Sequence, residues 1–225
     1  MSFSCEWEQQ YSANRQNSIW PWSDLVSYVM RYCDHNRVFK VLELGCGVGA
    51  NIPFFKSLGV DYYAIEGSKS AVERLKNAFP CYKNNIVCGD FTKQIDFQGK
   101  FDLVVDRASL THNSSTDIEN CLQLIVNVLE QDGKFVGIHW FSTQHSDYNS
   151  RDGISIDTYT KSNISTGPFK GGGRVHFSNE QHLQDLFAEN FVLDKLEHHL
   201  IECRSSNVFL AWWNFIAVKK SILGG

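Results

Sequence analysis

The chain has 225 residues, 43% of them hydrophobic and 20% charged, with a formal net charge of −4, a balance that predicts one globular domain and excludes an intrinsically disordered chain. No basic run exceeds Lys219-Lys220, so the sequence lacks the stripe of positive charge that nucleic-acid phosphates require. Neither a signal-like start nor an apolar run of about 18 residues occurs, so we expect a cytoplasmic protein that does not cross a membrane.

The first part of the chain alternates helical and strand patterns. Apolar side chains recur at helical spacing over 22–33, and a strand-like run over 38–44 meets the glycine-rich turn Gly45-Cys46-Gly47-Val48-Gly49. A short helix is predicted over 51–58. The next strand, over 60–65, ends at Glu66, and a Ser70-x-x-Glu73 capping box begins the helix after it.

The alternation continues through the middle of the chain. A strand over 85–88 ends in Gly89-Asp90-Phe91, and one over 101–105 ends in Asp106-Arg107. A helix with a Thr116-x-x-Glu119 box and a stop at Asp132-Gly133 leads to a strand over 134–141. Such alternation predicts a parallel sheet with helices on both faces and a ligand at the carboxyl ends of the strands.

The last part of the chain differs. After a long polar stretch, a helix begins at Ser178, and strand-like runs over 191–201 and 207–218 are joined by so short a loop that they must pair antiparallel. We therefore predict a single α/β domain over 1–225, doubly wound, with a mostly parallel seven-stranded sheet and a C-terminal antiparallel hairpin. We expect residues 1–37 to form an N-terminal helical lid and 142–177 a substrate loop or lid.

The strongest cluster of candidate residues surrounds the first glycine turn. Gly45-x-Gly47-x-x-Ala50 also satisfies a dinucleotide-binding pattern, so an NAD(P)-dependent oxidoreductase is one alternative. Glu43 argues against it, because a carboxylate about 5 Å from a pyrophosphate is repelled by roughly 3 kcal/mol. A ligand with an ammonium and a sulfonium group, such as S-adenosylmethionine, is attracted instead.

Glu43-x-Gly45-x-Gly47-x-Gly49, Glu66 and Gly89-Asp90-Phe91 resemble the ordered motifs of class I (seven-stranded, Rossmann-like) S-adenosylmethionine-dependent methyltransferases. The resemblance spans 38–141, and the predicted hairpin extends it to the C-terminus. It implies that Glu66 binds the ribose hydroxyls, that Asp90 and Phe91 contact the adenine, and that Glu43 lies near the methionine end. The residues expected to bind the cofactor are Glu43, Gly45, Gly47, Glu66, Gly67, Asp90, Phe91, Asp106, Arg107 and Trp20.

Aromatic residues before the first strand are candidates for a wall over the cofactor. A tryptophan over the sulfonium contributes about 2 kcal/mol by cation–π attraction. Among Trp7, Tyr11, Trp20 and Trp22, we expect Trp20 in the site and Trp22 in the core.

The catalytic candidates follow the fourth strand. Without an Asn-Pro-Pro-Tyr-like tetrapeptide there, oxygen is the favoured acceptor atom. Histidine suits deprotonation of a hydroxyl, because its unperturbed pKa lies near working pH. We expect His112 to be the general base, oriented by Asp106 or Asp117, with His145 and then His139 as alternatives.

The acceptor is less clearly marked. Ile19-Trp20-Pro21-Trp22 and Asp106 to His112 resemble, more loosely, small-molecule methyltransferases of bacterial surface-polysaccharide biosynthesis, which implies a hydroxyl of a sugar or of a nucleotide-linked or phosphorylated metabolite. Lys170 and Arg174 either hold a phosphate or lie in a mobile solvated loop.

The remaining alternatives concern turnover, metals and assembly. A methyltransferase-like binding module without turnover is the second alternative to the enzyme. Seven scattered cysteines without a C-x-x-C pair predict reduced thiols and no metal site. The sequence leaves the oligomeric state open.

Overall fold

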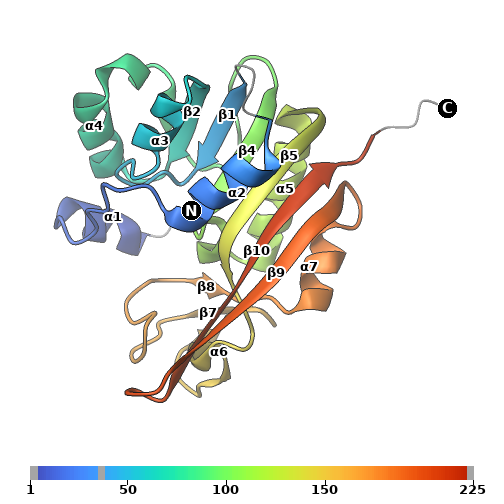
Figure 1. The fold of residues 1–225 in the computed structure, drawn as a ribbon. Coiled ribbons are helices and arrows are strands. Elements are labelled where there is room, and N and C mark those ends of the chain that lie inside the picture. Colours follow the sequence, from blue (N-terminus) through green and yellow to red (C-terminus); the bar gives the residue numbers. More distant parts are fainter. Residues whose placement is uncertain (1–4, 35–38, 222–225) are drawn as a thin grey trace.

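The computed structural model describes residues 5–34 and 39–221. A seven-stranded sheet with the order β3-β2-β1-β4-β5-β10-β9 runs through the molecule (Figure 1). Its strands are β1 (Lys40–Leu44), β2 (Asp61–Glu66), β3 (Ile86–Cys88), β4 (Phe101–Arg107), β5 (Leu129–Phe141), β9 (Phe191–Cys203) and β10 (Val208–Lys219). The first five strands pair in parallel, and β10 is antiparallel to both β5 and β9. The predicted fold class is confirmed.

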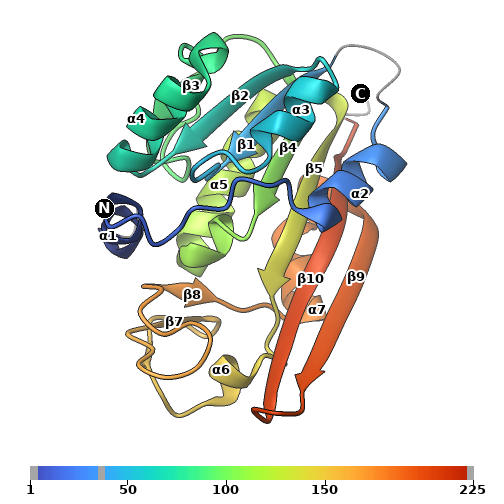
Figure 2. The same ribbon diagram turned by 60° about the vertical axis from the view of Figure 1, so that its left-hand side comes forward.

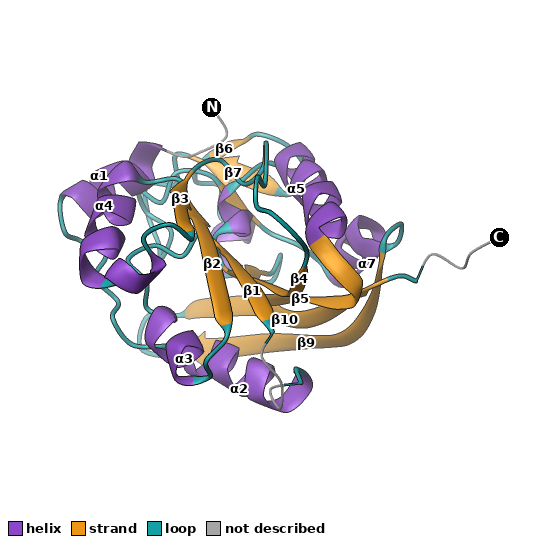
Figure 3. Ribbon diagram, turned by 90° about the horizontal axis from the view of Figure 1, so that it is seen from above, coloured by secondary structure: helices purple, strands orange, loops and turns teal. Residues whose placement is uncertain are grey.

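Helices cover both faces of the sheet (Figure 3). On one face, α2 (Ser23–Tyr32), α3 (Ile52–Ser57) and α4 (Lys69–Ala78) share a core with Val41 and Val105. On the other, α5 (Ser115–Val128) and α7 (Glu180–Phe187) pack in a core with Leu42 and Val104. Because neighbouring residues of a strand point to opposite faces, each central strand is buried on both sides.

Helix boundaries shift from the predicted ones where a nearby residue makes the better cap. Ser68, rather than Ser70, caps α4, and Ser114 caps α5, each serine oxygen accepting a hydrogen bond from the N–H three residues later. Helix α5 also ends at Val128, four residues before the predicted stop, because Leu129 pairs with Phe101 of β4. Strand pairing thus overrides the local glycine signal at the end of this helix.

The 142–177 segment, expected as a loop, carries secondary structure of its own. It contains α6 (Ser146–Asn149) and a three-stranded antiparallel sheet of β6 (Ile154–Ser155), β7 (Thr160–Ser162) and β8 (Val175–His176). Each strand has only two or three residues, too few for alternation to be visible in the sequence. In Figures 1 and 2 this segment and α1 (Cys5–Ser12) lie at the same end of the main sheet.

A buried pair of histidines joins this segment to α7. The Nε2 atoms of His176 and His182 are 3.2 Å apart, Nδ1 of His176 is 2.9 Å from the Thr160 hydroxyl, and the Tyr159 ring stacks on His182. Burial lowers the pKa of His176 to about 3 and that of His182 to about 4, and the nearby Asp157 carboxylate only partly opposes this shift. The folded protein therefore holds both rings neutral at pH 7.

We expect this pair to make the protein less stable in acid. An unfolded histidine takes up a proton below about pH 6.5, whereas these folded rings resist it until about pH 4 or lower. Their contribution is therefore complete above pH 6.5 and lost as the pH falls, by about 1.4 kcal/mol per pH unit per histidine. Urea unfolding at pH 7.5 and 5.0 measures the loss.

The double variant His176→Gln/His182→Gln isolates the pair from His112 and His145, whose pKa values burial also lowers to about 4. Its free energy of unfolding should depend less on pH than that of the wild type. Equal slopes in the two proteins would show that the pair is not responsible.

Candidate functional site

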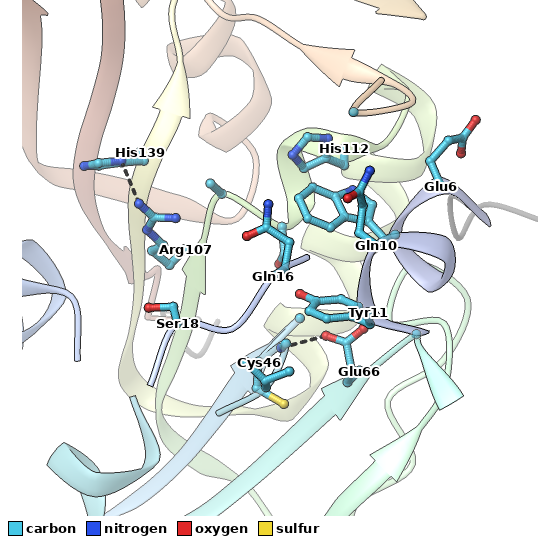
Figure 4. A pocket seen from close by; sticks show the side chains of 18 of the residues that line it. Glu6, Gln10, Tyr11, Gln16, Ser18, Cys46, Glu66, Arg107, His112 and His139 are labelled. Carbon is cyan, nitrogen blue, oxygen red and sulfur yellow. Dashed lines mark hydrogen bonds between the residues drawn. The ribbon is translucent and has the colours of Figure 1, made fainter. Parts of the chain in front are cut away.

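A cavity of about 550 Å³ opens at the carboxyl ends of β1, β2 and β4. Its size is within the range of about 300 to 1,000 Å³ that is typical of ligand sites. Its walls include α1 with the segment that follows it, the glycine turn after β1, the ends of β2 and β3, the loop after β4, part of β5, and residues 168–172 of the 142–177 segment. Figure 4 shows the side chains that line it.

The glycine turn after β1 packs closely against neighbouring side chains in the cavity wall. Gly45 and Gly47 have φ values of +63° and +56°, in the left-handed region that favours glycine. A Cβ on Gly47 would lie 2.6 Å from the Tyr11 hydroxyl oxygen, and one on Gly45 would overlap Ser109. Both the backbone conformation and the close packing therefore require glycine at these positions.

Glu66 ends β2 beneath this turn and is almost fully buried. One carboxylate oxygen accepts the Gly47 N–H at 2.8 Å, and the other accepts the Ser68 N–H at 2.8 Å. Burial raises the pKa of Glu66, while the N–H donors of Ser68 and Gly47 oppose the rise. Each oxygen keeps a further lone pair, which suits a pair of ligand hydroxyls. Tyr11 from α1 lies beside this carboxylate (Figure 4).

Glu43 lines the cavity but takes part in an internal network. Its carboxylate accepts hydrogen bonds from the Tyr62 hydroxyl at 2.5 Å and from the Asn51 amide at 2.8 Å. The Asn51 oxygen in turn accepts the Trp22 N–H at 3.1 Å, so the network anchors the N-terminal segment over the turn. Asn51 is not recognisable as a site residue from the sequence, because an asparagine at a helix start usually acts only as a cap.

The ends of β2 and β3 contribute the residues expected there. Gly67 after β2, and Asp90 and Phe91 after β3, line the cavity. One oxygen of Asp90 accepts hydrogen bonds from the N–H of Thr92 at 3.0 Å and from its hydroxyl at 2.6 Å. This geometry holds the Asp90 side chain in one orientation at the cavity wall.

The structure corrects the expectation for Asp106. Its carboxylate is fully buried and is not among the atoms that line the cavity. One oxygen accepts hydrogen bonds from the Leu110 N–H at 2.9 Å and from the N–H and hydroxyl of Ser109, and the other accepts the Trp140 indole N–H at 2.7 Å. Asp106 therefore shapes the loop after β4 from below and contacts neither the cavity nor His112.

His112, by contrast, lines the cavity. It ends a short 3-10 helix, Leu110–His112, and its Nδ1 is 2.7 Å from the Arg174 carbonyl oxygen. Because a carbonyl only accepts, Nδ1 must carry the proton. Burial lowers the pKa of His112 to about 4, with the Arg174 and Gly172 carbonyls opposing, so the ring is neutral at pH 7. The orienting group is thus a backbone carbonyl.

Two expected orienting or binding groups point elsewhere. The Asp117 carboxylate accepts a hydrogen bond from Ser114 and lies 3.1 Å from the Lys93 amine and 3.7 Å from the Arg174 guanidinium. Arg174 is therefore paired with Asp117 outside the cavity wall, whereas Lys170 lines the wall. The structure does not bring Lys170 and Arg174 together as one phosphate site.

His145 also lies outside the cavity wall. Its Nδ1 accepts the Asp147 N–H at 3.1 Å and so caps α6, and its ring packs against Phe169 and Phe177. Burial lowers the pKa of His145 to about 4. The structure therefore places His145, expected as a catalytic alternative, at the start of α6 and not in the cavity wall.

The two tryptophans of the N-terminal segment exchange their expected places. Trp20 is 77% exposed and does not line the cavity, so it is not placed over a cofactor. Trp22 does line it, and the Arg107 guanidinium carbon lies 3.5 Å from the centre of its ring. The Asn51 contact to the Trp22 backbone sets this orientation, which sequence spacing does not reveal.

Residues 5–34 and 39–221 contain no helix with the length and apolar character that a bilayer span requires. Within the same residues, no group of three or more His, Cys, Asp or Glu side chains is arranged to hold a metal ion.

Comparison with known proteins identifies the domain. Residues 42–137, which hold the glycine turn and the strand ends around the cavity, match the family model of a methyltransferase domain. The chain is an S-adenosylmethionine-dependent methyltransferase. The cofactor is therefore S-adenosylmethionine, and the NAD(P)-dependent oxidoreductase and the module without turnover are set aside.

Solved structures share the fold of this methyltransferase at low sequence identity. An S-adenosylmethionine-dependent methyltransferase from Methanosarcina mazei is 18% identical with a TM-score of 0.67, over 85% of this chain and 96% of that one. The 1,6-didemethyltoxoflavin-N1-methyltransferase of Burkholderia thailandensis, solved with S-adenosylhomocysteine, is 15% identical with a TM-score of 0.67, over 96% and 87%. A glycopeptide N-methyltransferase complexed with sinefungin is 17% identical with a TM-score of 0.61, over 88% and 86%.

Among curated proteins, none matches the methyltransferase significantly. The comparisons give no support to a place in surface-polysaccharide biosynthesis.

Proposed function

We propose that this methyltransferase methylates a hydroxyl oxygen of a small molecule. The small molecule would bind between the main sheet and the two segments that cover the cavity, α1 and residues 142–177. The observation that carries the proposal is the neutral imidazole of His112 in the cavity wall, with its tautomer set by the Arg174 carbonyl. Gln10, Gln16 and Ser18 line the same cavity, and these uncharged polar groups favour a hydroxyl-rich acceptor such as a sugar derivative.

The cavity fits the cofactor at its glycine-turn side. The Glu66 carboxylate in the cavity wall suits the hydroxyls of a ribose, and Gly67, Asp90 and Phe91 would hold the adenine beyond it. Glu43 would act at the methionine end through Asn51 and the N-terminal segment. When bound, S-adenosylmethionine supplies a methyl group activated by its sulfonium.

His112 is the residue that moves a proton in this proposal. With Nδ1 protonated, the other ring nitrogen is the basic one, and it accepts the proton of the acceptor hydroxyl. Such a base contributes about 10² to 10⁴ in rate, whereas orientation of the two reactants supplies roughly 7 to 11 kcal/mol of the barrier. The larger contribution therefore comes from the walls of the cavity.

The two covers are proposed to supply that orientation and to exclude water. Helix α1 places Trp7 and Tyr11 in the cavity wall, and the 142–177 segment places Phe169 there. The α1 cover is attached by polar contacts: the Glu8 carboxylate accepts hydrogen bonds from Ser68 and Ser70 at the start of α4. Contacts of this kind, on a helix with no fully buried residue, suit a lid that opens to admit ligands.

Binding of S-adenosylhomocysteine tests the cofactor site. Glu66→Ala should weaken binding at least about tenfold, because the loss of charge-assisted hydrogen bonds costs about 1.5 kcal/mol or more. Isothermal titration calorimetry gives both affinities. Glu73→Ala is the matched control, since it removes the same charge from the exposed face of α4. Equal affinity of Glu66→Ala and the wild type would remove Glu66 from the site.

A further inference from the structure

Arg107 ends β4 in the cavity wall, where three side chains hold it. The central carbon of its guanidinium lies over the Trp22 ring, 3.5 Å from the ring centre, and one of its NH₂ groups is 3.2 Å from Nδ1 of His139. The opposite nitrogen of His139, Nε2, is 2.8 Å from a carboxylate oxygen of Asp24. Figure 4 shows Arg107 and His139 on the side of the cavity away from Glu66.

The chemistry of the donors determines the protons in this chain of contacts. A guanidinium only donates, so Nδ1 of His139 must accept and carries no proton. The ring proton is then on Nε2 and is donated to Asp24. Burial lowers the pKa of His139, as does the charge of Arg107, and the ring stays neutral. Asp24, His139 and Arg107 thus form a chain of hydrogen bonds, in which Arg107 donates to His139 and His139 donates to Asp24.

The backbone aims His139 at Arg107. His139 has a φ of +58°, a strained value for a residue other than glycine, at a cost of order 1 to 3 kcal/mol. Its N–H donates to the Asn214 side-chain oxygen at 2.9 Å, and its ring packs on Trp212. These contacts retain the strained conformation, so the ring that holds Arg107 is itself held by residues of the neighbouring strand β10.

The charge of Arg107 lacks a direct counter-ion. In the described part of the chain, no carboxylate oxygen lies within the 4.0 Å of an ion pair with it, and Asp24 reaches it only through His139. Its Nε is buried without a hydrogen-bond partner. Burial lowers the pKa of Arg107 to about 10, so it remains a cation at pH 7. An oriented cation of this kind in a ligand cavity fits an anionic ligand group.

We propose that Arg107 is a carboxylate-binding site of the cavity, positioned by Trp22, His139 and Asp24. The planar fork of a guanidinium matches the two oxygens of a carboxylate, which is why arginine, held rigid in this way, is suited to it. The inference rests on the proposed function, because the carboxylate belongs either to the amino-acid end of the cofactor or to the acceptor. Both sources would present a carboxylate to Arg107, and the affinities of the ligands in the two experiments below distinguish them.

The first experiment compares S-adenosylhomocysteine with 5′-methylthioadenosine, which lacks the amino acid and its carboxylate. If the carboxylate is the cofactor's, Arg107→Gln weakens S-adenosylhomocysteine about tenfold or more and leaves 5′-methylthioadenosine unchanged. Arg107→Lys, which keeps the charge but not the fork, should lie between Arg107→Gln and the wild type. Arg204→Gln, which removes an exposed arginine of the β9–β10 turn, is the matched control for net charge.

The second experiment uses benzoate and its neutral analogue benzamide as probes, added to the protein saturated with S-adenosylhomocysteine. If the carboxylate is the acceptor's, benzoate binds the wild type more tightly than benzamide does, and Arg107→Gln removes the difference while leaving S-adenosylhomocysteine affinity unchanged. If Arg107→Gln alters neither ligand, the inference is overturned. If the wild type does not bind S-adenosylhomocysteine at all, the proposed function fails instead.

The positioning residues need a selective readout. His139→Phe keeps a ring against Trp212 but removes the acceptor for Arg107. It should reduce the affinity ratio between carboxylate and neutral ligands several-fold, with 5′-methylthioadenosine binding unchanged. If His139 had only a structural role, the variant would lose affinity for all ligands equally. That result would show that His139 does not position Arg107.

Discussion

Replacement of His112 by alanine is expected to lower kcat by about 10² to 10⁴ while S-adenosylhomocysteine binds as before. The reason is geometric, because His112 lines the cavity with Nδ1 anchored on the Arg174 carbonyl, which leaves the basic lone pair on Nε2. The measurement is S-adenosylhomocysteine released in single turnover, with an acceptor found by screening hydroxylated metabolites. Calorimetry on the same variant provides the control for cofactor binding.

The pH dependence of the wild type gives an independent reading of the same residue. A general base must be unprotonated, and burial lowers the pKa of His112 to about 4. The rate should therefore stay level from pH 8 to about pH 5 and fall as the pH approaches 4, wherever the protein remains folded. A His112→Ala variant that keeps more than about a third of kcat, with chemistry rate-limiting, would place the base elsewhere. His139 also lines the cavity, but Arg107 and Asp24 engage its two ring nitrogens, so it has no free nitrogen for this role.

The largest effect on stability is expected from Asp106→Ala. The change leaves the Trp140 indole N–H and the Leu110 N–H without a partner in a fully buried site. Each buried donor without a partner costs about 1 to 3 kcal/mol, so the free energy of unfolding should fall by roughly 3 to 5 kcal/mol. Urea denaturation monitored by tryptophan fluorescence measures the change.

Two further variants separate the parts of this network. Asp106→Asn keeps one oxygen for Leu110 and Ser109 but turns an NH₂ donor toward the Trp140 indole N–H, and should cost less than Asp106→Ala. Trp140→Phe removes the indole donor while keeping an aromatic ring in the core. If Asp106→Ala changed stability by less than about 0.5 kcal/mol, the carboxylate would not hold the loop, and a direct role for Asp106 in the site would be open again.

The cofactor side of the site was predictable because its residues are local to strand ends. Glu43, Glu66 and Asp90 each stand at or near the end of a strand that alternation identifies. Parallel strands bring such ends to one edge of the sheet, so chain order alone places these residues together. The glycine turn was also predictable from the sequence, since a positive φ at Gly45 and Gly47 favours glycine.

The acceptor side was not predictable in this way, because its residues come from segments that meet only in the folded chain. Asp106 was expected in the site from its strand-end position, yet its carboxylate oxygens accept hydrogen bonds from Trp140 and Ser109. The sequence likewise favoured Trp20 over Trp22, and the choice was made by the contact of Asn51 with the backbone of Trp22.

The sequence by itself therefore determined the sheet, the helices on its faces and the position of the cofactor residues, because hydrophobic periodicity and glycine conformation act over a few neighbouring residues. Only the tertiary structure decided that His112 and His139 line the cavity and that His145 caps a helix. It also decided that Arg107 in the cavity wall has no direct carboxylate partner among the described residues. Those outcomes depend on hydrogen bonds between residues such as His112 and Arg174, 62 positions apart. Buried polar groups must find partners wherever the fold brings them, and no local pattern records that choice.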